Sequence, residues 1–281
     1  MQKRNITYIL NLYLTAGGEF PKHCQNTLSH ALTAVGMAQS CDACLLVAVS
    51  RLDAQFFRKE LEGREEKVLI CELDNHSGMP PLSEILGCIG KTTLPSDRNS
   101  YVCYANADIN IPFWFFDFLN LNLNVMGENA GIVVNRKDVL DGESDISEGV
   151  KNVRCKDHPG FDCMVFPEKM SLDFSLGDCT IGYPPVGALL VTNMLHILPS
   201  VKLINDCLIT WHEGDGSASD WQEDHHREKI EENFMAAYLA LDKLFFKTPS
   251  AAQFSVKTLT HSSQLIRQYI NWKKRGAKFT S

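Results

Sequence analysis

The sequence lacks three short motifs that indicate common classes of binding site or active site. It contains no Gly-X-Gly-X-X-Gly turn, no Gly-X-X-X-X-Gly-Lys loop and no Gly-X-Ser-X-Gly elbow. The first motif cradles a dinucleotide, the second a triphosphate, and the third presents the nucleophile of many serine hydrolases. Dinucleotide-dependent, P-loop and serine-hydrolase functions therefore lose their main support.

Cysteine is too sparse for disulfide bonds to hold the fold together. The ten cysteines are scattered over 281 residues, and only Cys41 and Cys44 have the Cys-X-X-Cys spacing. A disulfide scaffold needs a denser framework, and a structural zinc site needs a second pair or well-spaced histidines. Most of the other cysteines lie in apolar runs, where a thiol acts as a small hydrophobic side chain. These features predict free thiols, a reducing cytoplasm and no zinc site.

Long apolar runs and extended basic blocks are also missing. The apolar stretch 6–14 is too short for a membrane span, and no other stretch approaches the roughly 18 apolar residues that a span needs. Lys and Arg number 27 against 34 Asp and Glu, the formal charge is −7, and basic residues gather only at 273–278. An acidic chain repels the phosphate backbone. We therefore expect no membrane span and no nucleic-acid partner.

Apolar stretches of strand length alternate with stretches of helix length in the first half of the chain. Strands are expected at residues 6–14, 44–50, 67–73 and 101–105, and helices at 21–39, 51–66, 82–90 and 112–120. Strands that are apolar almost throughout are typical of a parallel sheet covered by helices on both faces. The predicted fold is α/β, a three-layer sandwich around a mostly parallel central sheet.

The regular alternation stops near residue 140. The segment 141–158 is acidic and contains glycine, which is typical of a surface loop. Further strands are expected at 129–138 and 201–211, and further helices at 186–198, 221–246 and about 259–273. We predict one domain made of two halves, residues 1–140 and residues 141–281, the second ending in helices.

Asn106 and Asp108 follow the predicted strand 101–105 at its carboxyl end. Ligands of open α/β sheets gather at this edge, and a carboxylate there can hold a divalent cation. The alternative is that the two side chains only cap a turn, since Asn and Asp often accept hydrogen bonds from nearby backbone N–H groups. The residues alone leave both interpretations open.

Thr15, Ala16 and Gly17 follow the first predicted strand. Right-handed crossovers bring the loops after parallel strands to one edge, so this loop is expected to lie near Asp108. Its glycines would allow the backbone to approach a phosphate, although a plain tight turn explains them equally well.

His212 and Glu213 follow the predicted strand 201–211, in the run His-Glu-Gly-Asp-Gly. An imidazole and a carboxylate at the end of a strand suit a divalent metal or an acid/base pair. The alternative is a glycine-rich turn with a half-buried histidine at the strand's end.

Five short segments, taken in order, resemble the landmarks of glycosyltransferase-like proteins of the glycosyltransferase A fold. They are residues 104–109, 134–138, 158–166, 181–187 and 212–216, within a likeness that spans roughly residues 6–235. Asn106-Ala-Asp108 is similar to the Asp-X-Asp element of that family, with Asn in place of the first Asp, which removes one charge.

This resemblance implies a nucleotide-diphosphate sugar as donor, Mn²⁺ or Mg²⁺ as cofactor, and a glycan or another hydroxyl compound as acceptor. By it, Asp108 would bind the metal together with His212, and Asn106 would face the sugar or ribose of the donor. Asp162 would take the proton of the acceptor hydroxyl, and Glu213 would be a further catalytic carboxylate. Residues 1–140 would be the nucleotide-sugar-binding half and 141–281 the acceptor-side half.

Three functions remain open from the sequence. The first is a metal-dependent glycosyltransferase. The second is a sugar nucleotidyltransferase, whose glycine loop is similar to Ala16-Gly-Gly18, although Glu19-Phe-Pro21 follows here in place of the threonine, arginine and leucine of that family. The third is a catalytically silent module of the same fold that binds a nucleotide or a glycan.

Overall fold

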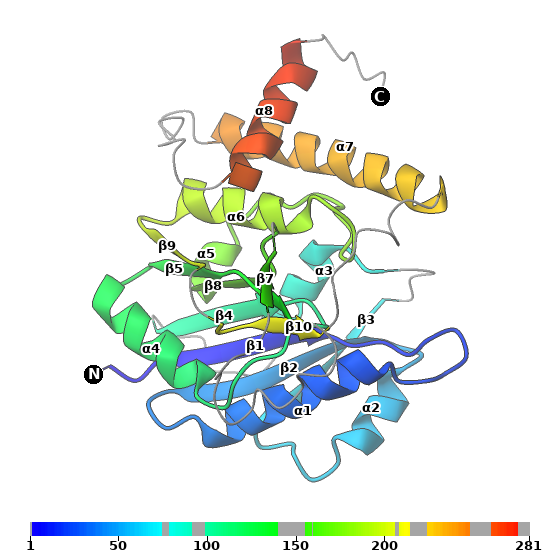
Figure 1. Cartoon of the computed structure of the whole chain (residues 1–281), viewed down its shortest axis with the longest axis vertical. Coiled ribbons are helices and arrows are strands. Elements are labelled where there is room, and N and C mark those ends of the chain that lie inside the picture. Colours follow the sequence, from blue (N-terminus) through cyan, green and yellow to red (C-terminus); the bar gives the residue numbers. More distant parts are fainter. Residues whose placement is uncertain are drawn as a thin grey trace.

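The computed structural model describes residues 2–74, 79–91, 99–139, 155–158, 160–205, 208–213, 224–247 and 260–274. Figure 1 shows the helices stacked above and below a central sheet. In chain order the elements are β1 (Asn5–Asn11), α1 (Lys22–Met37), β2 (Asp42–Ser50), α2 (Ala54–Glu60), β3 (Val68–Leu73), α3 (Leu82–Gly87), η1 (Ile89–Lys91), β4 (Ser100–Ala105), α4 (Phe115–Met126), β5 (Gly131–Val134), β6 (Lys137–Val139), β7 (Cys155–Asp157), β8 (Cys163–Pro167), α5 (Glu168–Ser171), α6 (Val186–Ile197), β9 (Val201–Ile204), β10 (Trp211–Glu213), α7 (Asp224–Lys247) and α8 (Thr260–Lys274).

Seven strands form one sheet in the order β3-β2-β1-β4-β8-β5-β9. β1 pairs in parallel with β2 and β4, β2 with β3, and β5 with β9, whereas β8 is antiparallel to both β4 and β5. The prediction of a mostly parallel sheet is confirmed. Because β8 runs the opposite way, its first residue, Cys163, pairs with Ala105 at the carboxyl end of β4. Asp162 therefore reaches the edge where the parallel strands end.

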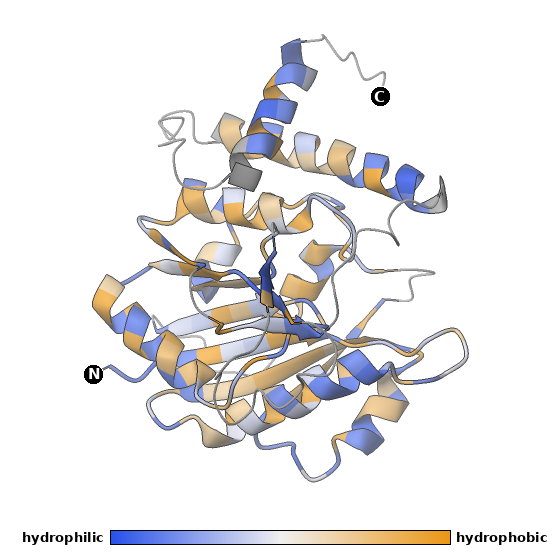
Figure 2. Cartoon of the chain, viewed as in Figure 1, coloured by the Kyte–Doolittle hydropathy of each residue, from blue (hydrophilic) through white to orange (hydrophobic). Residues whose placement is uncertain are grey.

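Helices cover both faces of this sheet, which confirms the predicted three layers (Figure 1). α1 and α4 bury residues such as Val35 and Leu119 against one face, and α3 and α6 bury residues such as Ile85 and Leu190 against the other. α7 and α8 pack over α6 and contribute to the second cluster. Figure 2 shows the strands of the sheet coloured mainly hydrophobic, as expected for strands buried on both sides. Each buried cluster draws on strands from both halves of the chain, and the functional division at residue 140 stays a prediction.

Two predicted strands are each divided between two sheets. Residues 129–138 form β5 in the main sheet and β6 in a three-stranded sheet of order β10-β6-β7, and residues 201–211 form β9 and the start of β10. The polar pair Asn135 and Arg136 separates the first two strands: Asn135 N still bonds to Ile204 O, whereas Lys137 N bonds to Thr210 O. The prediction of single strands was wrong because apolar periodicity does not show which neighbour a strand will pair with.

The helices after residue 180 agree with the predicted order. α6, α7 and α8 correspond to the stretches predicted at 186–198, 221–246 and 259–273. The predicted surface loop 141–158 lies mostly outside the described residues. Among the helices in the described part of the chain, none is long and apolar enough to cross a membrane.

Candidate functional site

A cavity of about 930 Å³ opens at the carboxyl edge of the main sheet. Its polar side is formed by residues after β4, between β5 and β6, before β8 and in β10. The other side is mostly apolar and comes from the loop before α6 and from α7 and α8. Its lining includes Asn106, Asp108, Arg136, Asp138, His158, Asp162 and His212 on the polar side, and Phe161, Ile181, Val186, Phe234 and Leu265 on the apolar side.

Asp108 lies on the polar wall and is held close to β10 by a short backbone bridge. Asn110 N donates to Trp211 O at 2.8 Å, and Trp211 N donates to Asn110 O at 3.1 Å. This pairing places Asp108 Oδ2 3.5 Å from His212 Nε2. Asp108 Oδ1 is buried and makes no hydrogen bond. An orphaned carboxylate oxygen beside an imidazole is a pair of donors that a divalent cation can use.

The turn-capping alternative for this stretch finds little support in the geometry. The turn is closed by the backbone, since Ile109 N donates to Asn106 O at 3.2 Å. The Asn106 side chain instead donates from Nδ2 to Asp162 Oδ1 at 3.0 Å and accepts from the Tyr104 hydroxyl at 3.3 Å. Asn106 thus faces the carboxylate of Asp162 and not the backbone of its own turn.

Asp162 directly precedes β8 and is almost completely buried, with its side chain 9% exposed. Burial raises the pKa of its carboxyl group, while Arg136 and His158 oppose that rise and Asp108 and Asp138 add to it. Asp162 Oδ2 makes no hydrogen bond and lines the cavity. A buried carboxylate with an unused oxygen can accept a proton from a bound hydroxyl group.

His212 has a lowered pKa, mainly because burial disfavours the charged imidazolium, with Asp108 acting in the opposite direction. Its Nδ1 is buried without a hydrogen bond and lies 3.8 Å from Asp138 Oδ1. A neutral imidazole is the form that binds a metal. The environment therefore keeps His212 available as a ligand at neutral pH.

Arg136, Asp138 and His158 complete the polar wall, and none of them was predicted as a site residue from the sequence. Arg136 Nε donates to Asp138 Oδ1 at 3.0 Å, and Arg136 Nη2 lies 3.2 Å from His158 Nδ1. Asp138 and His158 belong to segments that resemble family landmarks. The available signal was that the charged residues 136–138 come just after the apolar run 130–134, at the polar end of the predicted strand 129–138.

Other predicted site residues do not line this cavity. Glu213 accepts hydrogen bonds from Asn26 Nδ2 at 2.9 Å and from Asn110 Nδ2 at 3.4 Å, so its carboxylate connects β10 to α1 and to the segment after β4. Thr15, Ala16 and Gly17 lie on an exposed loop beyond β1, where Gly18 N donates to Thr15 O in a tight turn. The Gly-Asp-Gly segment 214–216 after Glu213 lies outside the described residues.

The described residues contain no cluster of three or more His, Cys, Asp or Glu side chains arranged to hold a metal ion. Asp108 and His212 supply two donors on the cavity wall, and Arg136 Nη1 lies 3.9 Å from Asp108 Oδ2. Two protein ligands fit a cation whose remaining positions are filled by phosphate oxygens and water, as is common for Mg²⁺. The donor set fits a metal that binds together with a diphosphate.

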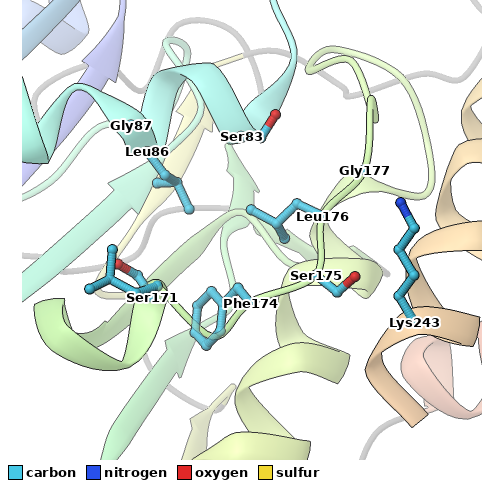
Figure 3. Close-up of a pocket in the computed structure, with 10 residues that line it drawn as sticks. Ser83, Leu86, Gly87, Ser171, Phe174, Ser175, Leu176, Gly177 and Lys243 are labelled. Carbon is cyan, nitrogen blue, oxygen red and sulfur yellow. The ribbon is translucent and has the colours of Figure 1, made fainter. Parts of the chain in front are cut away.

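A second cavity of about 320 Å³ lies between α3, the segment 171–177 and α7 (Figure 3). It is lined by Ser83, Leu86, Gly87, Ser171, Leu172, Phe174, Ser175, Leu176, Gly177 and Lys243. This lining contains no carboxylate and no imidazole. Among the described residues, the Asp and His side chains of the polar wall therefore line the larger cavity and not this one.

No protein-family model and no curated protein matches the chain. Solved structures do match. S. aureus TarS, residues 1–349 in complex with UDP-GlcNAc, aligns with a TM-score of 0.53 and 9% identity over 95% of this chain and 81% of that one. GalNAc-T7 with UDP, GalNAc and Mn²⁺ aligns with a TM-score of 0.51 and 7% identity over 98% of this chain and 56% of that one. The inositol-1-phosphate CTP transferase of T. maritima aligns with a TM-score of 0.46 and 12% identity over 82% of this chain and 96% of that one.

These likenesses establish the fold. The chain has the α/β architecture of nucleotide-diphospho-sugar transferases, of the glycosyltransferase A type, as the sequence resemblance predicted. At identities of 7–9% they do not carry an activity to this chain.

Gly187 sets the distance between α6 and the loop that carries Asp162. A Cβ added at Gly187 would lie 2.3 Å from the backbone oxygen of Phe161. We expect Gly187→Ala to destabilise the protein by about 1–3 kcal/mol, because backbone atoms must move to relieve the overlap. Gly36→Ala is the matched control, since Gly36 is exposed in α1 and nothing lies within 4 Å of its added Cβ; it should stabilise the protein by about 0.5–1 kcal/mol. Urea unfolding measures both, and equal stability of the Gly187 variant and the parent would contradict the packing.

Proposed function

We propose that this protein is a metal-dependent glycosyltransferase, which moves a sugar from a nucleotide-diphosphate donor to a hydroxyl acceptor. The supporting observation is the imbalance of charge in the large cavity. Three carboxyl groups, Asp108, Asp138 and Asp162, surround a single guanidinium, that of Arg136. When all three are ionised, two negative charges remain uncompensated, and a divalent cation beside Asp108 and His212 would balance them.

The donor side of the proposed site is the edge that carries Asn106 and Asp108. Asp108 and His212 would hold Mn²⁺ or Mg²⁺, and Asn106 would face the sugar or ribose. A bound metal would neutralise the charge that develops on the leaving diphosphate. A contact between the exposed loop Thr15–Gly17 and a phosphate remains a prediction, and the hydrogen bonds of Glu213 favour a structural role for that residue over the catalytic role first predicted for it.

The acceptor side is the half of the cavity next to Asp162. Asp162 Oδ2 would take the proton of the acceptor hydroxyl while the hydroxyl oxygen of the acceptor forms the new bond to the sugar. The bond between the sugar and the diphosphate breaks, and its electron pair leaves with the nucleoside diphosphate. The base must be ionised for this step, and its unused Oδ2 lines the cavity where a hydroxyl would bind.

Calorimetry with UDP tests the donor half of this proposal. We expect UDP to bind in MnCl₂ and to lose most of its affinity in EDTA, because Arg136 is the cation of the polar wall and is already paired with carboxylates. Equal affinity in EDTA would rule out a metal-dependent site.

A donor panel separates the three functions. A glycosyltransferase should slowly release the free nucleoside diphosphate from its donor by hydrolysis, and UDP-GlcNAc and UDP-GalNAc are the first donors to try. A nucleotidyltransferase would instead release pyrophosphate from a nucleoside triphosphate and a sugar phosphate. A silent module would bind a nucleotide or a glycan and release neither product.

A further inference from the structure

The guanidinium of Arg136 lies between the donor side and the acceptor side of the cavity. Its Nη1 is 3.9 Å from Asp108 Oδ2 and its Nε is 3.6 Å from Asp162 Oδ2. The side chain is 10% exposed and is fixed by the 3.0 Å hydrogen bond from Nε to Asp138. Arginine stays charged in any protein environment, so Arg136 is a permanent positive charge beside the buried oxygen of Asp162.

Arg136 also orients His158. A guanidinium can only donate hydrogen bonds, so His158 Nδ1, at 3.2 Å from Arg136 Nη2, is assigned as the acceptor. Asp138 Oδ2 approaches the same nitrogen less closely, at 3.4 Å. With Nδ1 as acceptor, the ring N–H is on Nε2, which lies 3.5 Å from Asp162 Oδ2. Arg136 thereby directs a second donor toward the same carboxylate oxygen.

Gly160 leaves room for this arrangement. A Cβ added at Gly160 would lie 2.7 Å from His158 Nε2 and 3.9 Å from Asp162 Oδ2. Any larger residue at 160 would therefore displace the imidazole from its present position beside the carboxylate. The loop before β8 permits close approach at the point where His158 meets Asp162.

We propose that Arg136 is a positioning residue for Asp162, which supplies the positive charge that the buried carboxylate lacks and turns the N–H of His158 toward it. This role rests on the proposed function, in which Asp162 is the base. The titratable and charged groups that face Asp162 are Arg136 and His158, which favour its ionised form, and Asp108 and Asp138, which oppose it. Burial opposes ionisation most strongly, and the two favourable groups offset part of the rise that burial causes in the pKa of Asp162.

The titration of Asp162 tests this proposal without any substrate. The full chain is labelled with ¹³C at the aspartate carboxyl groups, kept in EDTA, and titrated by NMR, with Asp162 assigned through the signal lost in Asp162→Asn. In Arg136→Gln, which keeps donor groups but loses the charge, the Asp162 midpoint should move to higher pH. Arg136→Lys, which restores the charge, should move it back toward the parent value.

Lys137→Met is the matched control. It removes one positive charge from the next residue, whose ammonium group pairs with the exposed Asp157 and not with Asp162. The Asp162 midpoint should stay where it is in the parent. If Arg136→Gln also leaves the midpoint unchanged, the proposal is overturned. Should Arg136→Gln not fold, Gly160→Ala leaves every charge in place and displaces His158, and an unchanged midpoint there would equally overturn it.

A rate profile extends the test to the reaction. With UDP-GlcNAc and MnCl₂, release of UDP by Arg136→Gln should fall roughly tenfold or more below the parent at pH 6 and much less at pH 9, since a high pH restores the ionised base. A loss that is equal at both pH values would indicate a merely structural role. If Asp162→Asn releases UDP as fast as the parent, the proposed function fails, whereas the NMR titration still decides whether Arg136 controls Asp162.

Discussion

Asp108→Ala should abolish metal-dependent nucleotide binding. The orphaned Asp108 Oδ1 and the neighbouring His212 Nε2 are the donors that this wall of the cavity offers to a cation. A ligand to the metal acts on the bound ground state as well as on the transition state, so its loss removes binding and turnover together. We expect the affinity for UDP in MnCl₂ to fall by about 100-fold or more, to the level seen in EDTA. Calorimetry measures this loss directly.

Two further variants make the result specific. His212→Ala should be intermediate, because loss of one neutral ligand weakens the metal without removing it, and more Mn²⁺ should restore the rate. Asp173→Ala removes a carboxylate from an exposed position outside the cavity and should bind UDP like the parent. If Asp108→Ala binds UDP and Mn²⁺ normally at an unchanged melting temperature, the metal assignment fails and Asp108 is only a turn residue.

Asp162→Asn should stop transfer while leaving nucleotide binding intact. The amide cannot take a proton from the acceptor, although its oxygen can still accept the hydrogen bond from Asn106 Nδ2. General-base catalysis contributes typically 10²–10⁴-fold, so the rate should fall by about that factor. UDP affinity in MnCl₂ should remain near the parent value, because Asp162 acts when the acceptor proton moves. If the affinity for UDP fell by the same factor as the rate, Asp162 would belong to the donor site.

The same variant should be more stable than the parent at neutral pH. The folded state raises the pKa of Asp162 above its unfolded value, mainly by burial, so ionising this group costs free energy only in the folded protein. The parent is therefore stabilised by this group below the ordinary carboxyl pKa of about 3.9 and loses that stability as pH rises through the folded pKa. Urea unfolding at pH 8 should give a larger free energy of unfolding for Asp162→Asn than for the parent. This difference between the two proteins should shrink as the pH is lowered. A difference that grows at low pH would contradict the direction of the pKa shift.

Prediction from the sequence was most successful where a residue's role depended on its neighbours in the chain. The apolar run 101–105 became β4, and Asn106 and Asp108 lie at its carboxyl end as predicted. Periodicity was less informative at Asn135 and Arg136, where the chain passes from one sheet to another. Glu213 shows the same limit, since its residue type suited catalysis but its side chain is held by Asn26 and Asn110.

The sequence by itself determined the α/β class, the mostly parallel sheet and the position of Asp108 at a strand end, because buried strands need apolar residues and turns need polar ones. Only the tertiary structure decided which charged groups meet. The antiparallel course of β8 brings Asp162 to the same edge as Asp108, and the break between β5 and β6 places Arg136 between them. Charges separated by tens of residues interact through space, and their distances depend on strand order and direction, which local patterns do not contain.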